Sequence, residues 1–227
     1  GWQTGPVDYY ISGSHFQTDG FEQDGSGADW AGDNLSANVG LALGSNTELR
    51  CHAGAYAGEG KDALADRETD RDFQMLTLTH AAPAAGPGTL VRVYRNGQRD
   101  VYDWSYPGEG IYRQETLGSE LQETLWLGDR NLLTAGLEWR EESVDIDEVS
   151  GPIVEDTTTS ALYGQDEICI SDSWLLILGV RGDDNEDYGS EVNPRIGLVW
   201  KVASAGEVYA SANRAYRAPS LSDRFVK

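Results

Sequence analysis

The chain has 227 residues, with 38 acidic and 17 basic side chains and a formal net charge of -21. This balance excludes a nucleic-acid-binding protein, because phosphate binding needs clustered Lys and Arg. The 27 glycines, 11 tyrosines and 7 tryptophans favour turns and strands and argue against a disordered chain.

Apolar residues recur at every second position along much of the chain. Leu35 to Leu43, Leu133 to Trp139 and Ile196 to Trp200 all alternate with small or polar residues. A period of two predicts strands with one apolar face and one polar face. None of the segments between the predicted strands has the pattern of a helix that could connect two parallel strands. We therefore expect antiparallel hairpins. The pattern predicts eleven strands, at 6–16, 34–44, 47–57, 72–82, 88–99, 112–126, 131–142, 159–171, 173–183, 192–202 and 206–216.

The predicted connections alternate in length. Short turns are expected at 44–46, 84–88, 128–131, 171–173 and 203–207, and long polar connections at 17–33, 58–71, 100–111, 143–158 and 184–191. Outer-membrane barrels have short periplasmic turns on one rim and long extracellular loops on the other. No apolar run of about 20 residues predicts a transmembrane helix, but a membrane β-strand needs only about 9–11 alternating residues. The sequence therefore predicts an all-β fold, an antiparallel transmembrane β-barrel.

Acidic residues concentrate in the long connections. The segment "EQDGSGADWAGD" (22–33) places carboxylates among small residues, and calcium takes about six to eight oxygen ligands. Asp19, Asp24 and Asp29 are therefore candidate calcium ligands, although the EF-hand spacing is absent and a solvated acidic loop is the alternative. Asp24, Asp29, Asp184 and Asp187 are also candidates for binding a ligand in the outer loops.

Motifs for other chemistry are absent from the sequence. His15, His52 and His80 fall on separate predicted strands, and neither G-x-S-x-G nor a complete Walker motif occurs. Cys51 and Cys169 form no C-x-x-C pair, so a zinc or redox motif is unsupported. We do not expect an enzyme, and calcium is the one cofactor that the sequence suggests.

Two segments near the end of the chain carry a recognisable pattern: "LGVRGDDNEDYGSEVNPRIGLVWK" (178–201) and "VYASANRAYRAPSL" (208–221). In order and spacing they resemble TonB-dependent outer-membrane receptors, which repeat L-G-x-R, N-P-R-x-G-L-V and R-A-P-S-L along neighbouring strands. The segment "LYGQDEI" (162–168) fits the preceding strand. Gly182 and Ala212 depart from the family pattern, because an aromatic residue is usual at both positions.

The resemblance implies a receptor in the bacterial outer membrane that takes up a scarce nutrient, such as an iron–siderophore complex, haem or cobalamin. It implies three partners: membrane lipid, the small-molecule metal complex, and a TonB-type energy-coupling protein that contacts an N-terminal part. Arg181 and Arg195 fall on the polar face and are expected to point into the lumen. Some vitamin B12 receptors of this family hold calcium in Asp-rich outer loops, which supports the calcium hypothesis.

Barrels of this family have about 22 strands and enclose a plug. Eleven strands cannot enclose such a lumen, and no plug-like stretch is evident, so we expect residues 1–227 to form a partial β-barrel domain. Two alternatives stay open. One is a passive porin or structural outer-membrane barrel, and the other is a soluble β protein engineered from such a barrel.

Overall fold

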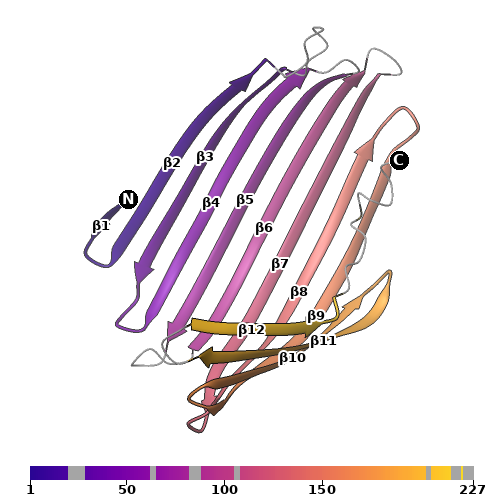
Figure 1. Cartoon of the computed structure of the whole chain (residues 1–227). Helices are drawn as coiled ribbons and strands as arrows, with labels where there is room; N and C mark the ends of the chain where they lie inside the picture. Colours follow the sequence, from indigo (N-terminus) through magenta and orange to yellow (C-terminus); the bar gives the residue numbers. More distant parts are fainter. Residues whose placement is uncertain are drawn as a thin grey trace.

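The computed structural model describes residues 1–19, 29–61, 65–81, 88–104, 108–202, 206–215 and 221. Its strands form one antiparallel sheet of twelve, in which the order in space follows the order in the chain (Figure 1). The strands are β1 (Trp2–Thr4), β2 (Val7–Thr18), β3 (Asp29–Ala42), β4 (Thr47–Lys61), β5 (Ala65–Ala81), β6 (Gly88–Trp104), β7 (Glu109–Leu127), β8 (Asn131–Asp147), β9 (Ile153–Ser171), β10 (Trp174–Asn185), β11 (Gly189–Val202) and β12 (Gly206–Asn213).

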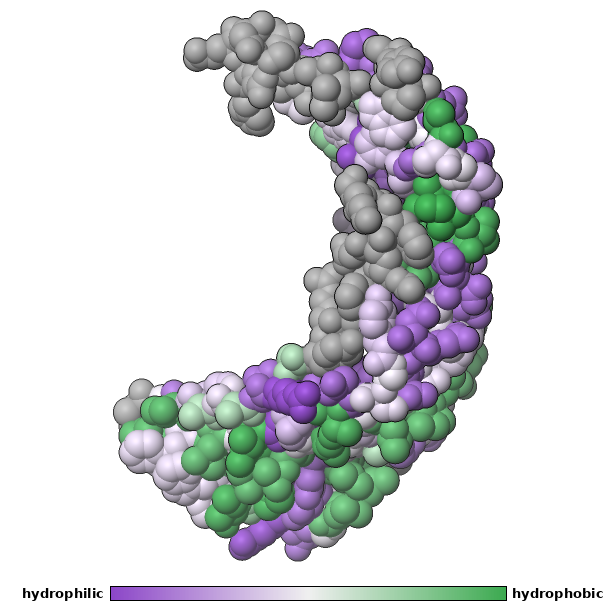
Figure 2. All heavy atoms as spheres, turned by 90° about the vertical axis from the view of Figure 1, so that its right-hand side faces the viewer, coloured by the Kyte–Doolittle hydropathy of each residue, from purple (hydrophilic) through white to green (hydrophobic). Residues whose placement is uncertain are grey.

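The sheet is strongly curved and is not closed. Figure 2 shows the molecule as a crescent that is open on one side. β1 and β12 are the two edges of the sheet, and they do not pair with each other. Within the described ranges, no helix is long and apolar enough to cross a bilayer. The all-β antiparallel fold is thus confirmed, as an open sheet.

One face of the sheet is apolar over its middle section. Across β5 to β8, two successive rows of register partners on this face are Leu78–Val91–Leu121–Leu137 and Leu76–Val93–Ser119–Trp139. We call them the apolar rows. Leu137 is 54% exposed and Val93 is 46% exposed, so nothing in the described chain covers this face. Large apolar side chains exposed in this way suit contact with lipid.

The opposite face is polar, and its side chains meet across intervening strands. Arg50 on β4 pairs with Asp8 on β2 at 3.1 Å, across Gly40 of β3. Arg181 on β10 pairs with Glu138 on β8 at 2.8 Å. Side chains from alternate strands converge where a sheet is concave, because neighbouring strands are about 4.8 Å apart. The polar face is therefore the concave face, and the apolar rows lie on the convex face.

The predicted loop pattern is wrong at one end of the sheet. β4 continues to Lys61, β5 begins at Ala65, β8 continues to Asp147 and β9 begins at Ile153. Much of the predicted long connections 58–71, 100–111, 143–158 and 184–191 is therefore strand, and long and short connections do not alternate. We call this end, where β2, β4, β6, β8 and β10 finish, the rim. β1, which precedes the turn at Gly5, is an additional strand that the sequence did not predict.

The strands continue toward the rim because their backbone hydrogen bonds continue there, although the side chains no longer alternate between apolar and polar. Residues 66–72 of β5, "DRETDRD", are polar on both faces, yet each pairs in register with both neighbouring strands. Ion pairs such as Lys61–Asp66 at 3.0 Å join the strand ends. A polar strand that projects into water needs no apolar face, because the sheet supplies its backbone hydrogen bonds.

Candidate ligand-binding site at the rim

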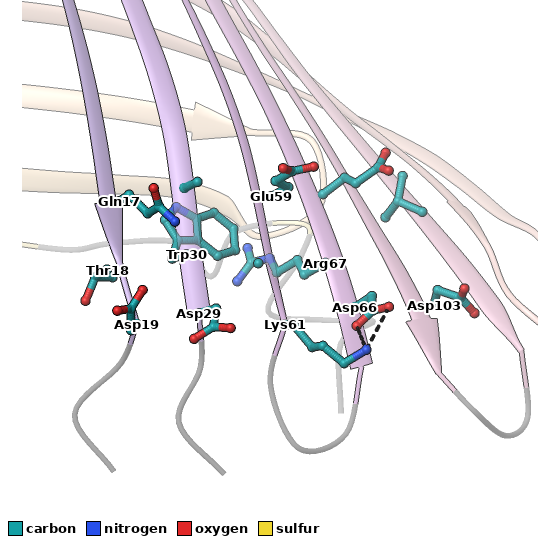
Figure 3. A pocket seen from close by; sticks show the side chains of 14 residues that line it. Gln17, Thr18, Asp19, Asp29, Trp30, Glu59, Lys61, Asp66, Arg67 and Asp103 are labelled. Carbon is teal, nitrogen blue, oxygen red and sulfur yellow. Dashed lines mark hydrogen bonds and ion pairs between the residues drawn. The ribbon is translucent and has the colours of Figure 1, made fainter. Parts of the chain in front are cut away.

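A cavity of about 490 Å³ lies among the rim ends of β2 to β6. Figure 3 shows Asp19 and Asp29 near the ends of neighbouring strands, Lys61 reaching Asp66, and Arg67 directed toward Trp30. The labelled lining residues are Gln17, Thr18, Asp19, Asp29, Trp30, Glu59, Lys61, Asp66, Arg67 and Asp103. The cavity is thus bordered by charges of both signs and by one large aromatic ring.

Beside this cavity, aromatic rings and arginines pack together on the concave face. The guanidinium carbon of Arg67 lies 5.7 Å from the ring centroid of Trp30 and 5.0 Å from that of Tyr102. Arg71 lies 6.0 Å from the ring of Tyr56, whose hydroxyl accepts a 2.7 Å hydrogen bond from the Trp30 indole N–H. These distances fit cation–π contacts. We call these five residues the aromatic–arginine cluster.

Register and one glycine explain why these side chains meet. Trp30 on β3 is opposite Gly60 on β4, Gly60 is opposite Arg67 on β5, and Arg67 is opposite Tyr102 on β6. All four residues therefore lie in one row. A Cβ at Gly60 would clash with the indole of Trp30. The absence of a side chain at Gly60 lets Trp30 and Arg67 meet above β4.

Asp100 holds Arg67 in place. Its Oδ1 atom lies 2.9 Å from Arg67 Nη2 and accepts a 2.6 Å hydrogen bond from the Thr69 hydroxyl, while Oδ2 accepts a 2.5 Å hydrogen bond from the Gln98 amide. Asp100 is only 5% exposed. Burial raises the pKa of Asp100, but the hydrogen bonds from Thr69, Gln98 and Arg67 lower it more, so the pKa lies below the ordinary value. The carboxylate therefore stays ionised and fixes the guanidinium.

The cluster has the chemistry to bind a small planar or anionic molecule. Arg67 and Arg71 supply guanidinium donors, and Trp30, Tyr56 and Tyr102 supply flat apolar surface next to the cavity. Guanidinium groups recognise carboxylate and other oxyanions in a bidentate manner and stack on rings. A second hollow of about 480 Å³ is lined by Trp30, Tyr56, Arg67 and Arg71, so it opens onto the cluster on the concave face. The first cavity touches the cluster only at Trp30 and Arg67, because most of its other lining residues belong to register rows on the convex face.

The structure brings together two of the predicted acidic site residues. Asp19 follows β2 and Asp29 begins β3, and both line the cavity. Asp24 lies outside the described residues. Asp184 is within β10 and accepts a 2.5 Å hydrogen bond from Ser190, while Asp187 is in the β10–β11 connection. Asp184 and Asp187 are therefore several strands away from Asp19 and Asp29.

The candidate metal ligands do not form a cluster by themselves. Among the residues that the structure describes, no three His, Cys, Asp or Glu side chains come together closely enough to hold a metal ion. Asp19 and Asp29 alone supply too few oxygen ligands for calcium, which takes about six to eight. The described residues thus do not complete a calcium site.

Arg181 and Arg195 lie on the same face of the sheet. Arg195 is the register partner of Gly179, two residues before Arg181 on β10. Arg181 is fixed by Glu138 and Asp183, both at 2.8 Å. These arginines line a separate hollow of about 420 Å³, well removed in the sheet from the aromatic–arginine cluster.

No member of the aromatic–arginine cluster was predicted from the sequence as a site residue. Trp30 and Arg67 fell in predicted loops 17–33 and 58–71, and Tyr102 in 100–111, so their shared row was not visible. The spacing of Arg67 and Arg71, four residues apart on one face of a strand, is a signal that could have pointed to them. Their neighbours across the sheet follow only from the register.

Comparisons with known proteins agree with the fold and with the sequence pattern. The family model described as "TonB dependent receptor-like, beta-barrel" matches residues 2–226. Vitamin B12 transporter BtuB of Photobacterium profundum is 26% identical over 212 residues, which is 90% of this chain and 34% of that protein. The iron-regulated outer membrane virulence protein of Vibrio cholerae is 30% identical over 97 residues, 41% of this chain and 15% of that protein.

Solved structures show the same architecture. The siderophore receptor PirA from Pseudomonas aeruginosa superposes with a TM-score of 0.83 and 19% identity, over 96% of this chain and 38% of PirA. The FrpB iron transporter from Neisseria meningitidis gives a TM-score of 0.82 with 16% identity, over 97% of this chain and 43% of FrpB. This chain spans about a third of the length of the BtuB that it matches. The chain belongs to the β-barrel family of TonB-dependent receptors of the bacterial outer membrane.

Proposed function

We propose that this chain forms part of the wall of a receptor that takes up a scarce nutrient as a small-molecule metal complex. The nutrient belongs to the iron–siderophore, haem or cobalamin class, and the aromatic–arginine cluster contacts it. The observation that carries this proposal is the position of Arg67 between Trp30 and Tyr102 on the concave face, beside a hollow of about 480 Å³ that Trp30, Tyr56, Arg67 and Arg71 line. The names of the relatives support these classes, since they include vitamin B12 transporters and siderophore receptors.

Energy coupling through a TonB-type protein is part of the same proposal. It is supported by the family model, and it separates the receptor from a passive porin. A receptor needs the coupling protein to import its ligand, whereas a porin does not. Removing the coupling protein from the cell therefore distinguishes the two functions.

The experiment is a growth assay in a strain that lacks the gene. The strain is supplied in turn with one ferric siderophore, haem or cobalamin as the only source of the nutrient. The gene for the wild-type protein should restore growth on one of them, and Arg67→Ala should not. Arg130→Ala is the control, because Arg130 is exposed at the end of the sheet opposite the rim. Equal growth with and without the gene on every source would refute the proposal.

Calcium binding at the rim is a secondary proposal. It is supported by Asp19 and Asp29, which line one cavity, and it needs further ligands, for which the sequence offers Asp24. Calorimetric titration with calcium should give a signal in the wild type that Asp29→Asn weakens. A titration without any signal in the wild type would exclude the site.

A further inference from the structure

Tyr112 on β7 lies beside the aromatic–arginine cluster and contacts one of its members directly. The ring centroid of Tyr112 lies 5.5 Å from that of Tyr102, and the two ring planes meet at 87°. Edge-to-face pairs of aromatic rings attract each other at this separation. The ring of Tyr102 lies in turn 5.0 Å from the guanidinium carbon of Arg67. Tyr102 is therefore the one side chain that separates Tyr112 from the guanidinium in this series of contacts.

The strand register brings Tyr112 close to Arg67 by a second path. Tyr112 is directly opposite Asp100 on β6, and side chains in such pairs have their Cβ atoms about 4.5–5.5 Å apart. Asp100 is only 5% exposed, and its Oδ1 atom lies 2.9 Å from Nη2 of Arg67. A large ring beside this carboxylate helps to keep water away from the ion pair. Tyr112 is thus a neighbour of both groups that hold the Arg67 guanidinium.

Gly110 leaves room for the rings that surround Tyr102. Gly110 is the register partner of Tyr102 on β7. A Cβ at Gly110 would lie 2.6 Å from Trp104 and 3.3 Å from Tyr112, so both rings extend over this position. Trp104 stacks on Tyr102, with ring centroids 5.5 Å apart and an interplanar angle of 7°. Tyr102 therefore packs against two other rings, and this packing restricts its movement away from Arg67.

Tyr112 is itself fixed on the side away from the cluster. Its hydroxyl donates a hydrogen bond to Glu148, which follows β8. Its register partner on β8 is Ile146, which is 1% exposed. Ile146 forms an apolar cluster with Val144 and Leu221, and Tyr112 packs against this cluster. The ring of Tyr112 is therefore anchored by buried apolar contacts as well as by its hydroxyl group.

We propose that Tyr112 is a positioning residue of the nutrient-binding site. Among the described residues, Tyr112 lines neither the rim cavity nor the second hollow, so it acts through Tyr102 and Asp100. It holds these two side chains against Arg67, and the guanidinium keeps its place before the nutrient arrives. Such preorganisation raises affinity, because fewer side chains have to be ordered on binding. This role rests on the proposed function, since it requires the aromatic–arginine cluster to contact the nutrient.

The test is equilibrium titration of the purified protein in detergent. The probes are a ferric tricatecholate complex, haemin and cyanocobalamin, and the variants are compared on the probe that the wild type binds. Tyr112→Leu should bind it about 5-fold more weakly, within the energy range of an aromatic pair. Tyr112→Phe keeps the ring and loses only the bond to Glu148, so its affinity should stay within about 2-fold of the wild type. Gly136→Ala, a destabilising change away from the cluster, should bind like the wild type.

A double-mutant cycle shows whether Tyr112 acts through Arg67. Residues that act on the same contact have non-additive effects, so Tyr112→Leu should weaken binding by less than about 2-fold when Arg67→Lys is already present. The full loss in that background would overturn the role of Tyr112. So would wild-type affinity in Tyr112→Leu, or an equal loss in Gly136→Ala, which would trace the effect to stability alone. Failure of the wild type to bind any of the probes would instead refute the proposed function.

Discussion

Tyr163 on β9 donates a 2.8 Å hydrogen bond to Glu120 on β7, although β8 lies between these two strands. The residue of β8 opposite Tyr163 is Gly136. A Cβ at this position would clash with the phenol ring and would lie 2.8 Å from the carbonyl oxygen of Leu121. The bond across β8 therefore depends on the absence of a side chain at Gly136, as the contact of Trp30 with Arg67 depends on Gly60.

Substitution Gly136→Ala should displace Tyr163 and break its bond to Glu120. The added methyl group meets backbone as well as the ring, so the cost should be about 1–3 kcal/mol in the free energy of unfolding. Thermal unfolding in detergent, followed by circular dichroism, measures it. Gly164→Ala is the matched control, because a Cβ at Gly164 has no neighbour nearer than 3.9 Å. Equal melting temperatures for the two variants would contradict the explanation.

Asp100 makes the stability of the rim depend on pH. Burial raises its pKa, but hydrogen bonds from Thr69, Gln98 and Arg67 outweigh burial and place the pKa below the ordinary value of 3.8. The folded state thus binds fewer protons than the unfolded state around this pH. The stabilisation is complete above the ordinary value and is lost as pH falls through the lowered pKa.

The variant Asp100→Asn tests this dependence. It should lose about 1–3 kcal/mol at neutral pH, because the ion pair with Arg67 is removed from a buried position. Below the ordinary pKa of 3.8, the difference in the free energy of unfolding between this variant and the wild type should become smaller. Unfolding midpoints of both proteins, measured across the acid range, provide the comparison. A difference between them that stays constant down to the lowest pH would show that Asp100 does not titrate as described.

Arg67→Lys should weaken binding of the nutrient complex that supports growth. Lysine retains a positive charge for Asp100 but lacks the planar group that lies over Trp30 and Tyr102. We expect affinity to fall about 10-fold, within the range of cation–π energies. Equilibrium titration with that complex gives the result, with Arg130→Lys as control. If Arg67→Lys binds the complex with the affinity of the wild type, the cluster is not part of the binding site.

Leu221, the last residue of the R-A-P-S-L motif, should contribute to stability. It is 5% exposed and belongs to an apolar cluster with Val144 and Ile146, which are 2% and 1% exposed. Leu221→Ala should cost about 2–3 kcal/mol, since it leaves a cavity in a packed contact. Val149→Ala, at a residue that is 65% exposed, should cost little in the same unfolding experiment. A negligible cost at Leu221 would show that the motif has no packing role.

The sequence predicted strands well at one end of the sheet and poorly at the other. The predicted starts 47 and 131 match β4 and β8, and the predicted end 171 matches β9. There one face meets lipid and the other is polar, so alternation is strong. In β5, both faces are polar toward the rim, as in residues 66–72, so the apolar–polar alternation is lost although the backbone pairing continues.

The candidate site was harder to predict than the fold. Asp19 and Asp29 were found from composition, and they do line the rim cavity. Trp30, Arg67 and Tyr102 are separated in the chain and meet only because β3 to β6 pair in one register. No feature within a single strand reveals that register. The role of Gly60 likewise follows only from its position between Trp30 and Arg67.

The length of the strands at the rim determines what a partner outside the bilayer would contact. At about 3.3 Å per residue, the 19 residues of β7 extend about 60 Å, whereas about 10 tilted residues cross an apolar band that is about 25 Å tall. The exposed part is a hydrogen-bonded sheet. An antibody or phage that recognises this wall would contact side chains from adjacent strands together, so a peptide copied from any one strand would be a poor mimic of its epitope.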